Sequence, residues 1–456
     1  MRKFLKHQNP MFEYAMENTN VALFCEMRLG KTLVAIRWAS QPKIKKVLVV
    51  APLPVVRVWE DELLAEEWAE QDIQILKGSK EKIHEKVQNP EARWFLTNYE
   101  SLIEIERKLK PGQVWKPKKR FPSILEKEWD CIILDESTKI RNPQAKVTKL
   151  LQDYAEKFPF KAILTGLPDP ESPLDYFEQM RFLYGSFLRC RNYWSFRRSW
   201  FWQIGYTFVV PKRTKVALKE ALEKQAFSMT RKQAGINIQK VYEKRYVPLT
   251  PAQKKLYKQI DKGFEYKIGK EEQQTRWVPV QYQWYGAIAG GFTPEGKFLS
   301  DAKVKEIINL LKTELKHEQV VVWFRYTHEI AYVSKALRKA GFKVGIFTGA
   351  SKDDSEKFKA KKIQVICAQG KCGQYGLNWS VASTAIYYSN WYDGEIRTQS
   401  EDRILHPTKA EPLLYIDLIA EDSIDEDVVE ILRKKKLNAK EFSEALQERW
   451  LKRLRA

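Results

Sequence analysis

The sequence has few cysteines and no pattern of them that would form a framework. Its 456 residues contain five cysteines, with no C-x-x-C pair and no histidine at metal-ligand spacing. A sparse and odd set of cysteines is typical of a reduced intracellular protein, and it disfavours a disulfide scaffold or a structural zinc site. We therefore expect a cytoplasmic protein.

Long apolar runs are also absent. No stretch approaches the roughly 18 consecutive apolar residues that identify a membrane helix. The first residues, MRKFLKH, lack the apolar core of a signal peptide. We therefore expect no membrane partner.

Acidic residues are in deficit. The chain has 79 Lys and Arg against 58 Asp and Glu, which gives a formal net charge of +21. Such a surplus is typical of a protein that binds a polyanion such as nucleic acid. It also fits a soluble protein with many surface lysines, so charge alone does not decide between the two.

Short apolar runs alternate with amphipathic stretches in two parts of the chain. This alternation predicts βαβ units and parallel sheets covered by helices on both faces. We therefore predict an α/β protein with two such sheets. The predicted strands are 21–25, 47–51, 94–97, 131–134 and 162–165 in the first part, and 320–324, 344–347, 364–367, 385–388 and 413–418 in the second.

Between these parts, aromatic and basic residues are crowded and strand-like runs are scarce. We predict a first lobe at 1–185, a largely helical insertion with the inter-lobe linker at 186–295, a second lobe at 296–435 and a basic C-terminal helix at 436–456. The length fits two or three domains.

A Gly-Lys-Thr triplet follows the first predicted strand and begins a predicted helix. In such a turn the backbone N–H groups around Gly30 cradle phosphate, Lys31 reaches the β and γ oxygens of ATP, and the Thr32 hydroxyl binds Mg²⁺. The full P-loop pattern requires a glycine where this chain has Cys25. The triplet alone therefore also fits an ordinary helix N-terminus.

A second motif lies at the end of the predicted strand 131–134, where Asp135 and Glu136 follow the apolar run. In a Walker B motif the first carboxylate holds Mg²⁺ through its water shell, and the second orients and deprotonates the attacking water. Taken alone, the pair fits a solvated acidic turn equally well. Together with the triplet, it predicts an ATPase site.

The order of the motifs resembles that of superfamily two helicases, and among them the Swi/Snf-type ATPases, over nearly the whole chain. The segments that carry the resemblance are Gln8 ahead of motif I, 47–53 with Trp59 and Glu62 (motif Ia), 97–100, 164–168 (motif III), 229–232 and 246–257 (the junction of the lobes), Ser300 with Lys303, 320–324 (motif IV), 373–378 (motif V), and Trp391 with 399–403 (motif VI).

The resemblance implies two RecA-like lobes and a nucleic-acid-dependent ATPase that translocates on DNA in replication, recombination or repair. It implies ATP and Mg²⁺ as cofactors, and single- or double-stranded DNA as partner, with other replication or repair proteins as further partners. The implied catalytic residues are Lys31, Glu136 and Arg403, and the implied nucleotide-binding residues are Gln8, Gly30, Lys31, Thr32, Asp135, Glu136 and Arg403, with Thr32 and Asp135 at the metal.

Three departures from the family pattern stand out. Arg28 replaces the middle glycine of motif I, and motif II reads Asp-Glu-Ser-Thr where Asp-Glu-Ala-His is usual. In motif VI, His406 stands in the place of the second arginine, and a neutral imidazole cannot replace a bidentate guanidinium. Either Arg403 acts alone at the γ-phosphate or another arginine of the second lobe contributes.

Candidate nucleic-acid contacts fall into two groups. Polar loop residues near motifs Ia, IV and V are placed to hold phosphates. The aromatic and basic stretch 189–202 is either a stacking and phosphate-binding protrusion or a helix with aromatic residues inside and arginines outside. The residues that we assign are Thr97, Asn98, Thr348 and Asn378 in loops, and Arg191, Arg197 and Arg198 in the stretch.

Two other functions stay open at this point. One is a strand-separating DNA or RNA helicase, for which only residues 194–202 could supply a wedge. The other is a nucleic-acid-binding scaffold that uses ATP as a switch with little turnover, which the lost arginine of motif VI allows and Glu136 disfavours.

Overall fold

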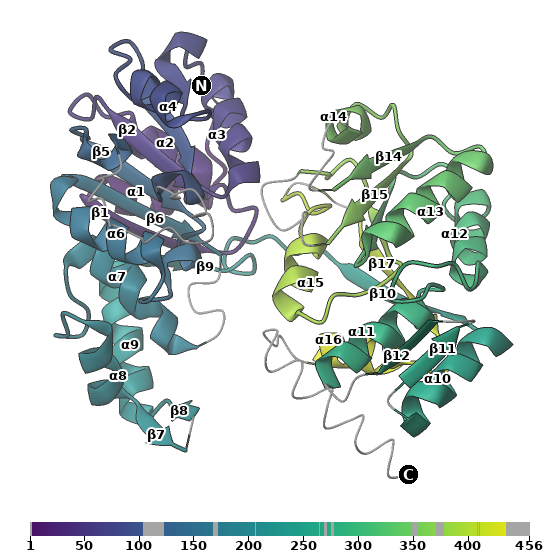
Figure 1. Ribbon diagram of the computed structural model, residues 1–456. Helices are drawn as coiled ribbons and strands as arrows, with labels where there is room; N and C mark the ends of the chain where they lie inside the picture. Colours follow the sequence, from purple (N-terminus) through teal and green to yellow (C-terminus); the bar gives the residue numbers. More distant parts are fainter. Residues whose placement is uncertain are drawn as a thin grey trace, which may run out of the picture. The chain divides into compact units, whose positions relative to one another are not determined.

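The chain folds into two compact units, Met1–Asn237 and Ile238–Ala456, each built around a sheet whose strands are all parallel (Figure 1). The structure is a computed structural model that describes residues 2–103, 123–166, 172–205, 207–263, 265–268, 271–274, 278–348, 354–370, 378–407, 409 and 411–434. The predicted α/β class with two parallel sheets is confirmed. Within these ranges, no helix has the length and apolarity to span a membrane.

The sheet of unit 1 has seven strands in the order β3-β4-β2-β5-β6-β1-β9. All five strands predicted for this part are present, and most of their side chains are buried because helices cover both faces. The strands are β1 (Asn20–Cys25), β2 (Val47–Ala51), β3 (Ile73–Ile75), β4 (Trp94–Asn98), β5 (Cys131–Asp135), β6 (Phe160–Thr165) and β9 (Phe227–Met229).

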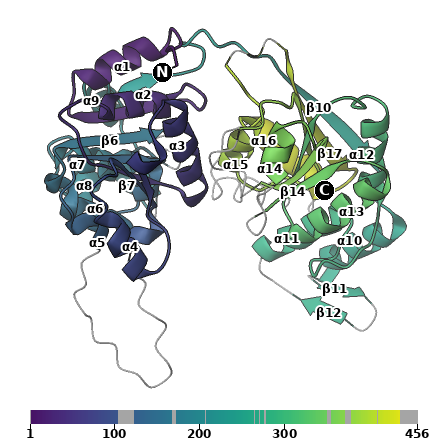
Figure 2. The ribbon, with the colours of Figure 1, turned by 90° about the horizontal axis from the view of Figure 1, so that it is seen from above.

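Helices α6 and α7 pack against one face of this sheet. On that face, Ala22, Phe24 and Leu48 of the strands form one core cluster with side chains of the two helices. Helices α2 and α3 add no residue to that cluster and cover the opposite face (Figure 2). The helices are α1 (Gln8–Met16), α2 (Lys31–Ala39), α3 (Leu53–Ala65), α4 (Lys80–Val87), α5 (Ser123–Glu126), α6 (Lys146–Tyr154), α7 (Tyr176–Tyr184), α8 (Tyr193–Trp200) and α9 (Lys212–Gln225).

The sheet of unit 2 has six strands in the order β10-β17-β16-β13-β15-β14. Helices α12 and α13 pack on one face and α14 on the other, and α10, α11 and α16 form a separate apolar cluster. The elements are β10 (Lys240–Val247), α10 (Pro251–Gly263), α11 (Val278–Ala289), α12 (Ala302–Lys312), β13 (Val320–Phe324), α13 (Thr327–Lys339), β14 (Val344–Phe347), α14 (Asp354–Lys359), β15 (Val365–Gln369), β16 (Thr384–Tyr387), α15 (Gly394–Glu401), β17 (Leu413–Ala420) and α16 (Ile424–Lys434).

The segment 186–295 is divided between the two units at Asn237. Its first part adds α8, α9 and the hairpin of β7 (Trp202–Ile204) and β8 (Thr207–Val209) to unit 1. Its second part adds β10, α10, the hairpin of β11 (Glu265–Ile268) and β12 (Glu271–Gln274), and α11 to unit 2. The expected start of lobe two at residue 296 therefore needs correction, because β10 pairs with β17 along its whole length. The expected helix at 436–456 lies outside the described residues.

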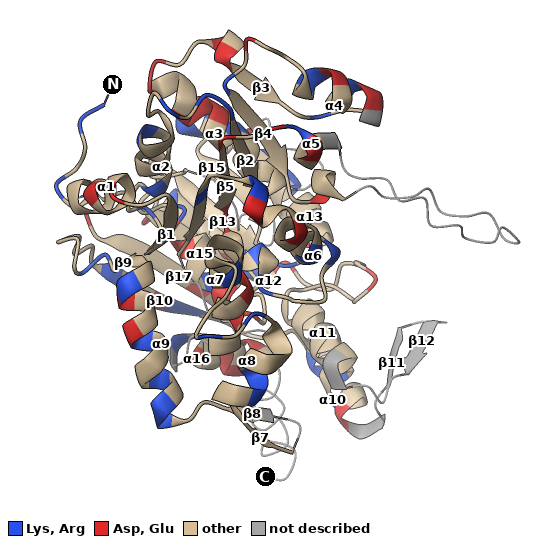
Figure 3. Cartoon of the chain, turned by 90° about the vertical axis from the view of Figure 1, so that its left-hand side faces the viewer, with Lys and Arg blue, Asp and Glu red and all other residues tan. Residues whose placement is uncertain are grey.

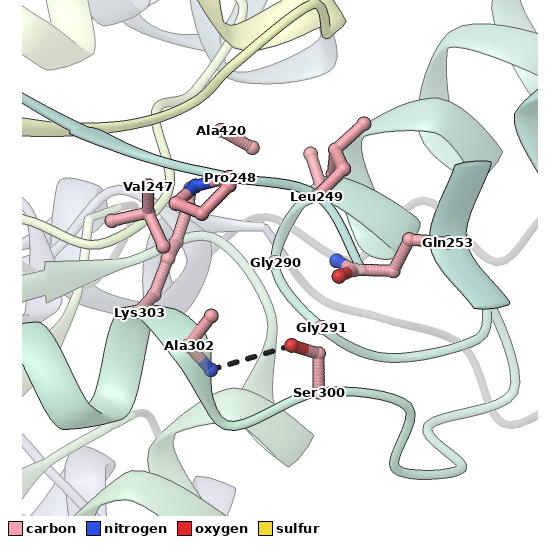
Figure 4. A pocket seen from close by; sticks show the side chains of 11 residues that line it. Val247, Pro248, Leu249, Gln253, Gly290, Gly291, Ser300, Ala302, Lys303 and Ala420 are labelled. Carbon is pink, nitrogen blue, oxygen red and sulfur yellow. Dashed lines mark hydrogen bonds between the residues drawn. The ribbon is translucent and has the colours of Figure 1, made fainter. Parts of the chain in front are cut away.

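A buried polar cluster holds the start of α12 against the sheet of unit 2. The Lys303 ammonium donates to the Tyr388 carbonyl at 2.9 Å and pairs with Asp425 at 2.6 Å. Beside this cluster lies a small cavity of about 10 Å³, and Lys303, Ser300 and Gln253 are among the residues that line it (Figure 4). A space of this size holds one water molecule at most, so it is no ligand site.

Glu329, on α13, is fully buried near this cluster. Burial raises the pKa of Glu329 from its ordinary 4.5 to about 7, although the hydrogen bond from Ser389 and the charge of Lys303 act in the opposite direction. The folded chain therefore keeps a proton on Glu329 at pH values where the unfolded chain has lost it. Folding stability from this group is present below pH 4.5 and is lost as the pH rises through about 7.

We predict that Glu329→Gln removes this pH dependence, because the amide cannot ionise. The free energy of unfolding of the wild type should fall between pH 4.5 and 8 by up to about 3 kcal/mol more than that of the variant. Denaturant titrations across this range measure the difference, with Glu356→Gln, an exposed position on α14, as control. Parallel curves for wild type and Glu329→Gln would contradict the assignment.

Candidate active site

The candidate ATPase residues of unit 1 lie at one edge of its sheet. Because β1, β4, β5 and β6 are parallel, their carboxyl ends meet at this edge, which is the usual ligand-binding edge of an open α/β sheet. Lys31 follows β1, and Asp135 and Glu136 lie at the end of β5.

The turn between β1 and α2 has the backbone that a phosphate cradle needs. Gly30 is the N-cap of α2, with φ +77°, and no side chain caps the helix. The first turn of α2 therefore presents backbone N–H groups that can donate hydrogen bonds to a bound anion. Arg28 has φ +70°, a left-handed conformation that glycine adopts with less strain. This explains why the family has glycine at that position.

Gln8 packs directly against this turn. It is 4% exposed, its amide donates to the Leu29 carbonyl at 3.4 Å, and its Oε1 accepts from the Leu5 N–H at 2.8 Å. A β-carbon on Gly30 would lie 1.8 Å from Gln8 Nε2. The structure thus brings together Gln8, Gly30 and Lys31, three residues that the sequence assigned to one site.

Lys31 reaches back across the turn. Its ammonium donates to the carbonyls of Cys25 at 2.7 Å and Glu26 at 3.3 Å. Burial raises the pKa of Cys25 to about 11, although the charge of Lys31 lowers it. Cys25 is therefore a neutral structural residue at neutral pH, and the positive charge of the site belongs to Lys31. Thr32, the next residue, is partly exposed.

Asp135 is held by a network that the sequence did not reveal. Its carboxylate accepts hydrogen bonds from Trp59 Nε1 at 2.8 Å and from the Glu136 N–H at 2.9 Å, and its backbone carbonyl accepts from the Tyr99 hydroxyl at 2.8 Å. Burial raises the pKa of Asp135, while the bond from Trp59 and the charge of Lys31 lower it. Asp135 and Lys31 therefore act on each other electrostatically.

The turn after Asp135 has a left-handed backbone at Glu136 and a buried hydroxyl at Ser137, where the family pattern has alanine. Glu136 has φ +53° and ψ +56°, a left-handed conformation for a residue with a β-carbon, and strain of this kind is concentrated at functional sites. Ser137 is fully buried, and its hydroxyl donates to Gln179 of α7 at 2.7 Å. Thr165 of motif III is also buried, whereas residues 167 and 168 lie outside the described residues.

A second connection ties the turn to the segment after β9. The Glu26 carboxylate pairs with Arg231 Nε at 2.9 Å and accepts from the Arg231 N–H at 3.1 Å, and the Glu26 N–H donates to the Met229 carbonyl at 3.0 Å. Arg231 lies in the segment that resembled the junction of the lobes. Its pairing with Glu26 could not be inferred, because two distant charged residues carry no local sign of contact.

In unit 2, motif VI forms α15 and the turn after it. Arg403 is 6% exposed, and its Nε donates to the Gln399 carbonyl at 3.0 Å. Arg397, which the sequence did not single out, pairs with Glu401 at 2.9 Å and with the buried Asp417, so it fixes α15 on the sheet. Both arginines therefore lie within unit 2.

The predicted nucleic-acid residues occupy different environments. Thr97 is 1% exposed at the end of β4, and its hydroxyl is not presented to solvent. The Asn98 side chain accepts from the Ser101 N–H at 2.7 Å, which is a structural turn contact. Thr348 follows β14 and is partly buried, and Asn378 is exposed. Of the arginines, Arg191 and Arg198 are exposed and Arg197 is partly buried.

Other candidate sites in the described part of the chain are weaker. No group of three or more His, Cys, Asp or Glu residues there could hold a metal ion by itself. A groove of about 710 Å³ runs beside α9, β9 and Tyr14, but it contains none of the residues assigned above.

Comparison with known proteins agrees with the motif order. The family model described as SNF2-related domain matches residues 7–291. Chromodomain-helicase-DNA-binding protein 1-like from Danio rerio is 23% identical over 88% of this chain, but the match spans only 40% of that protein. A protein, p41, of Acyrthosiphon pisum secondary endosymbiont phage 1 is 22% identical over 93% of this chain and 94% of its own length. A solved Sulfolobus solfataricus SWI2/SNF2 ATPase core in complex with dsDNA is 18% identical, covers 95% of this chain and 92% of its own, and has a TM-score of 0.43.

We predict that Gly30→Ala disrupts the nucleotide turn, because the new methyl group would overlap the Gln8 amide. The variant should lose measurable ATP binding and should be less stable than wild type. Gly185→Ala is a matched control: Gly185 has φ +72°, but a β-carbon there has no neighbour within 4 Å. It should cost roughly 1–2 kcal/mol of backbone strain and keep ATP binding. Equal ATP affinities for the two variants, by calorimetry, would contradict the geometry.

Proposed function

Because the chain belongs to the SNF2-related domain family, as its motif order predicted, we propose that it is a nucleic-acid-dependent ATPase that couples ATP hydrolysis to translocation on DNA. The observation that carries the proposal is the edge of the sheet in unit 1. There an uncapped helix N-terminus, a lysine that reaches across the turn and a buried aspartate lie together.

The residues at this edge fit a nucleotide and a magnesium ion. The N–H groups at the start of α2 suit phosphate oxygens, and Lys31 exchanges its two carbonyl partners for the β and γ oxygens. Asp135 and Thr32 would hold Mg²⁺, which prefers one or two protein oxygens together with phosphates and water. The ion, when bound, neutralises charge on the phosphates.

Glu136 is the residue that we propose for orienting and deprotonating the attacking water. Its backbone N–H is committed to the Asp135 carboxylate, so the position of the two acidic residues is coupled. The tight backbone of Glu136 turns the chain immediately after β5. Arg403 stays our candidate for the γ-phosphate, and its Nε donates to the Gln399 carbonyl.

DNA is the polymer that we propose, and the positive charge of the chain supports a polyanionic partner. Lysine and arginine residues outnumber glutamates along α9 (Figure 3). A cytoplasmic location, and replication or repair proteins as partners, stay predictions.

We predict different effects on ATP binding for substitutions of Lys31 and Glu136. Lys31→Ala should lose productive ATP binding, because the phosphate charge is no longer balanced. Glu136→Gln should bind ATP and lose hydrolysis by about 10²-fold or more, because the amide cannot accept a proton. ATP binding, DNA-stimulated multiple-turnover ATPase activity and displacement of a triplex-forming strand together measure these steps.

Lys82→Ala and Glu85→Gln, both exposed on α4, are the control variants and should behave as wild type. Wild-type turnover in Lys31→Ala or Glu136→Gln would refute the site. A wild type that binds ATP without multiple turnovers would favour the switch over the motor. Comparing double-stranded DNA, single-stranded DNA and RNA as activators identifies the polymer.

The net charge of +21 predicts DNA binding that depends strongly on salt. If roughly six phosphates are neutralised, the affinity should fall by about 10³-fold between about 50 and 200 mM salt, because bound counterions are released. Fluorescence anisotropy of labelled duplex across this range measures the slope. A flat response would leave the charge surplus without a nucleic-acid explanation.

A further inference from the structure

The β7–β8 hairpin of unit 1 carries an apolar face that is open to solvent. Trp202 pairs with Val209 and Ile204 with Thr207 across the two strands. Directly paired residues lie on one face of a hairpin, and residues two apart along a strand share that face. Trp202, Ile204 and Val209 therefore lie together, and they are 58%, 61% and 41% exposed.

The opposite face anchors the hairpin. Phe208, on that face, packs against the core of unit 1, and the Arg197 guanidinium lies 4.3 Å from its ring centroid and 4.5 Å from that of Trp194. The strand entry is fixed as well, because Thr214 and Arg213 of α9 donate to the carbonyls of Trp200 and Ser199. The exposed apolar face therefore belongs to a hairpin that is packed and hydrogen-bonded against the rest of unit 1.

The segment that carries this face is strongly basic. Residues 186–219 contain no Asp or Glu, and their basic residues are Arg189, Arg191, Arg197, Arg198, Lys212, Arg213, Lys215 and Lys219. Among their described side chains, only Lys219 contacts a carboxylate, that of Glu223 at 3.8 Å on the surface. A surplus of positive charge in the segment that carries an apolar face favours a polyanion that also carries flat apolar groups, and nucleic acid has this chemistry.

We propose that the hairpin face formed by Trp202, Ile204 and Val209 binds unpaired or terminal bases where a single strand meets a duplex. Within a duplex each base is stacked on both sides, so an indole can stack only on a base that has lost a neighbour. The exposed Arg198, near the end of α8, is the candidate contact for the adjoining phosphates. The inference deepens the proposed function, because it names branched or tailed DNA as the preferred substrate.

The test uses the full chain and a forked DNA that carries 2-aminopurine at the junction, with a blunt duplex of equal length. Stacking on Trp202 should change the 2-aminopurine fluorescence, and Trp202→Ala should abolish the change. The same variant should lose about 5- to 150-fold in affinity for the fork, the range for one aromatic–base stack, and bind blunt duplex within about twofold of wild type.

Three variants distinguish stacking from other roles. Trp202→Phe should restore much of the fluorescence change, whereas Trp202→Leu, which keeps apolar bulk without an aromatic ring, should not. Val216→Ala, an apolar position of α9 that is 50% exposed, should match wild type. Thermal unfolding should be nearly unchanged in all variants, because the altered side chains are exposed.

Wild-type fork affinity in Trp202→Ala would overturn the proposal. A full fluorescence change and full fork affinity in Trp202→Leu would overturn it as well, because apolar bulk without an aromatic ring would then be sufficient. ATPase activity with the forked DNA and with the blunt duplex is measured in the same samples. Absence of activity with both DNAs in the wild type would remove the proposed motor function, whereas a junction signal that depends on Trp202 would still establish the hairpin site.

Discussion

The parallel direction of the strands in unit 1 is the constraint on which the candidate site depends. Lys31 and Asp135 are far apart in the sequence, and β6 separates β1 from β5 in the sheet. They meet only because parallel strands place their carboxyl ends at one edge. Parallel pairs require crossover connections, and the helices in those connections bury the sheet on both faces. The same topology therefore produces the apolar strands and the polar edge.

Charge balance at this edge follows from burial. Water is excluded around Asp135, which raises its pKa, and Trp59 and Lys31 partly offset the cost of keeping the carboxylate ionised. Lys31 is held meanwhile by two backbone carbonyls, which are neutral partners that a phosphate can replace. The site thus keeps its charged groups separate and ready to accept an anion and a metal ion.

Much of the fold could be predicted from the sequence, because a buried parallel strand appears there as a short apolar run. All ten predicted strands are present within a residue or two. The strands β3 and β9 were missed because they have three residues each, and β10 because charged residues alternate along an edge strand, KVYEKRYV. For the candidate site, the motifs and the family resemblance predicted Gln8, Gly30, Lys31 and Asp135, and the structure places Gln8 against Gly30 and Lys31 within electrostatic reach of Asp135. The partners Trp59, Arg231 and Gln179 could not be identified, because their contacts join segments that are far apart in the chain.

The aromatic and basic stretch shows why composition alone left two interpretations open there. Phe196 and Phe201 are buried in the core of unit 1, whereas Trp194 and Trp202 are exposed. Helical periodicity in α8 turns Phe196 inward, and the alternation of a strand turns Trp202 outward directly after Phe201. The core interpretation is therefore confirmed for the two buried phenylalanines, whereas stacking by the exposed indoles stays a prediction. Since an exposed indole loses apolar stabilisation that burial would provide, the outward position of Trp202 in a region without acidic residues is better explained by a ligand than by folding.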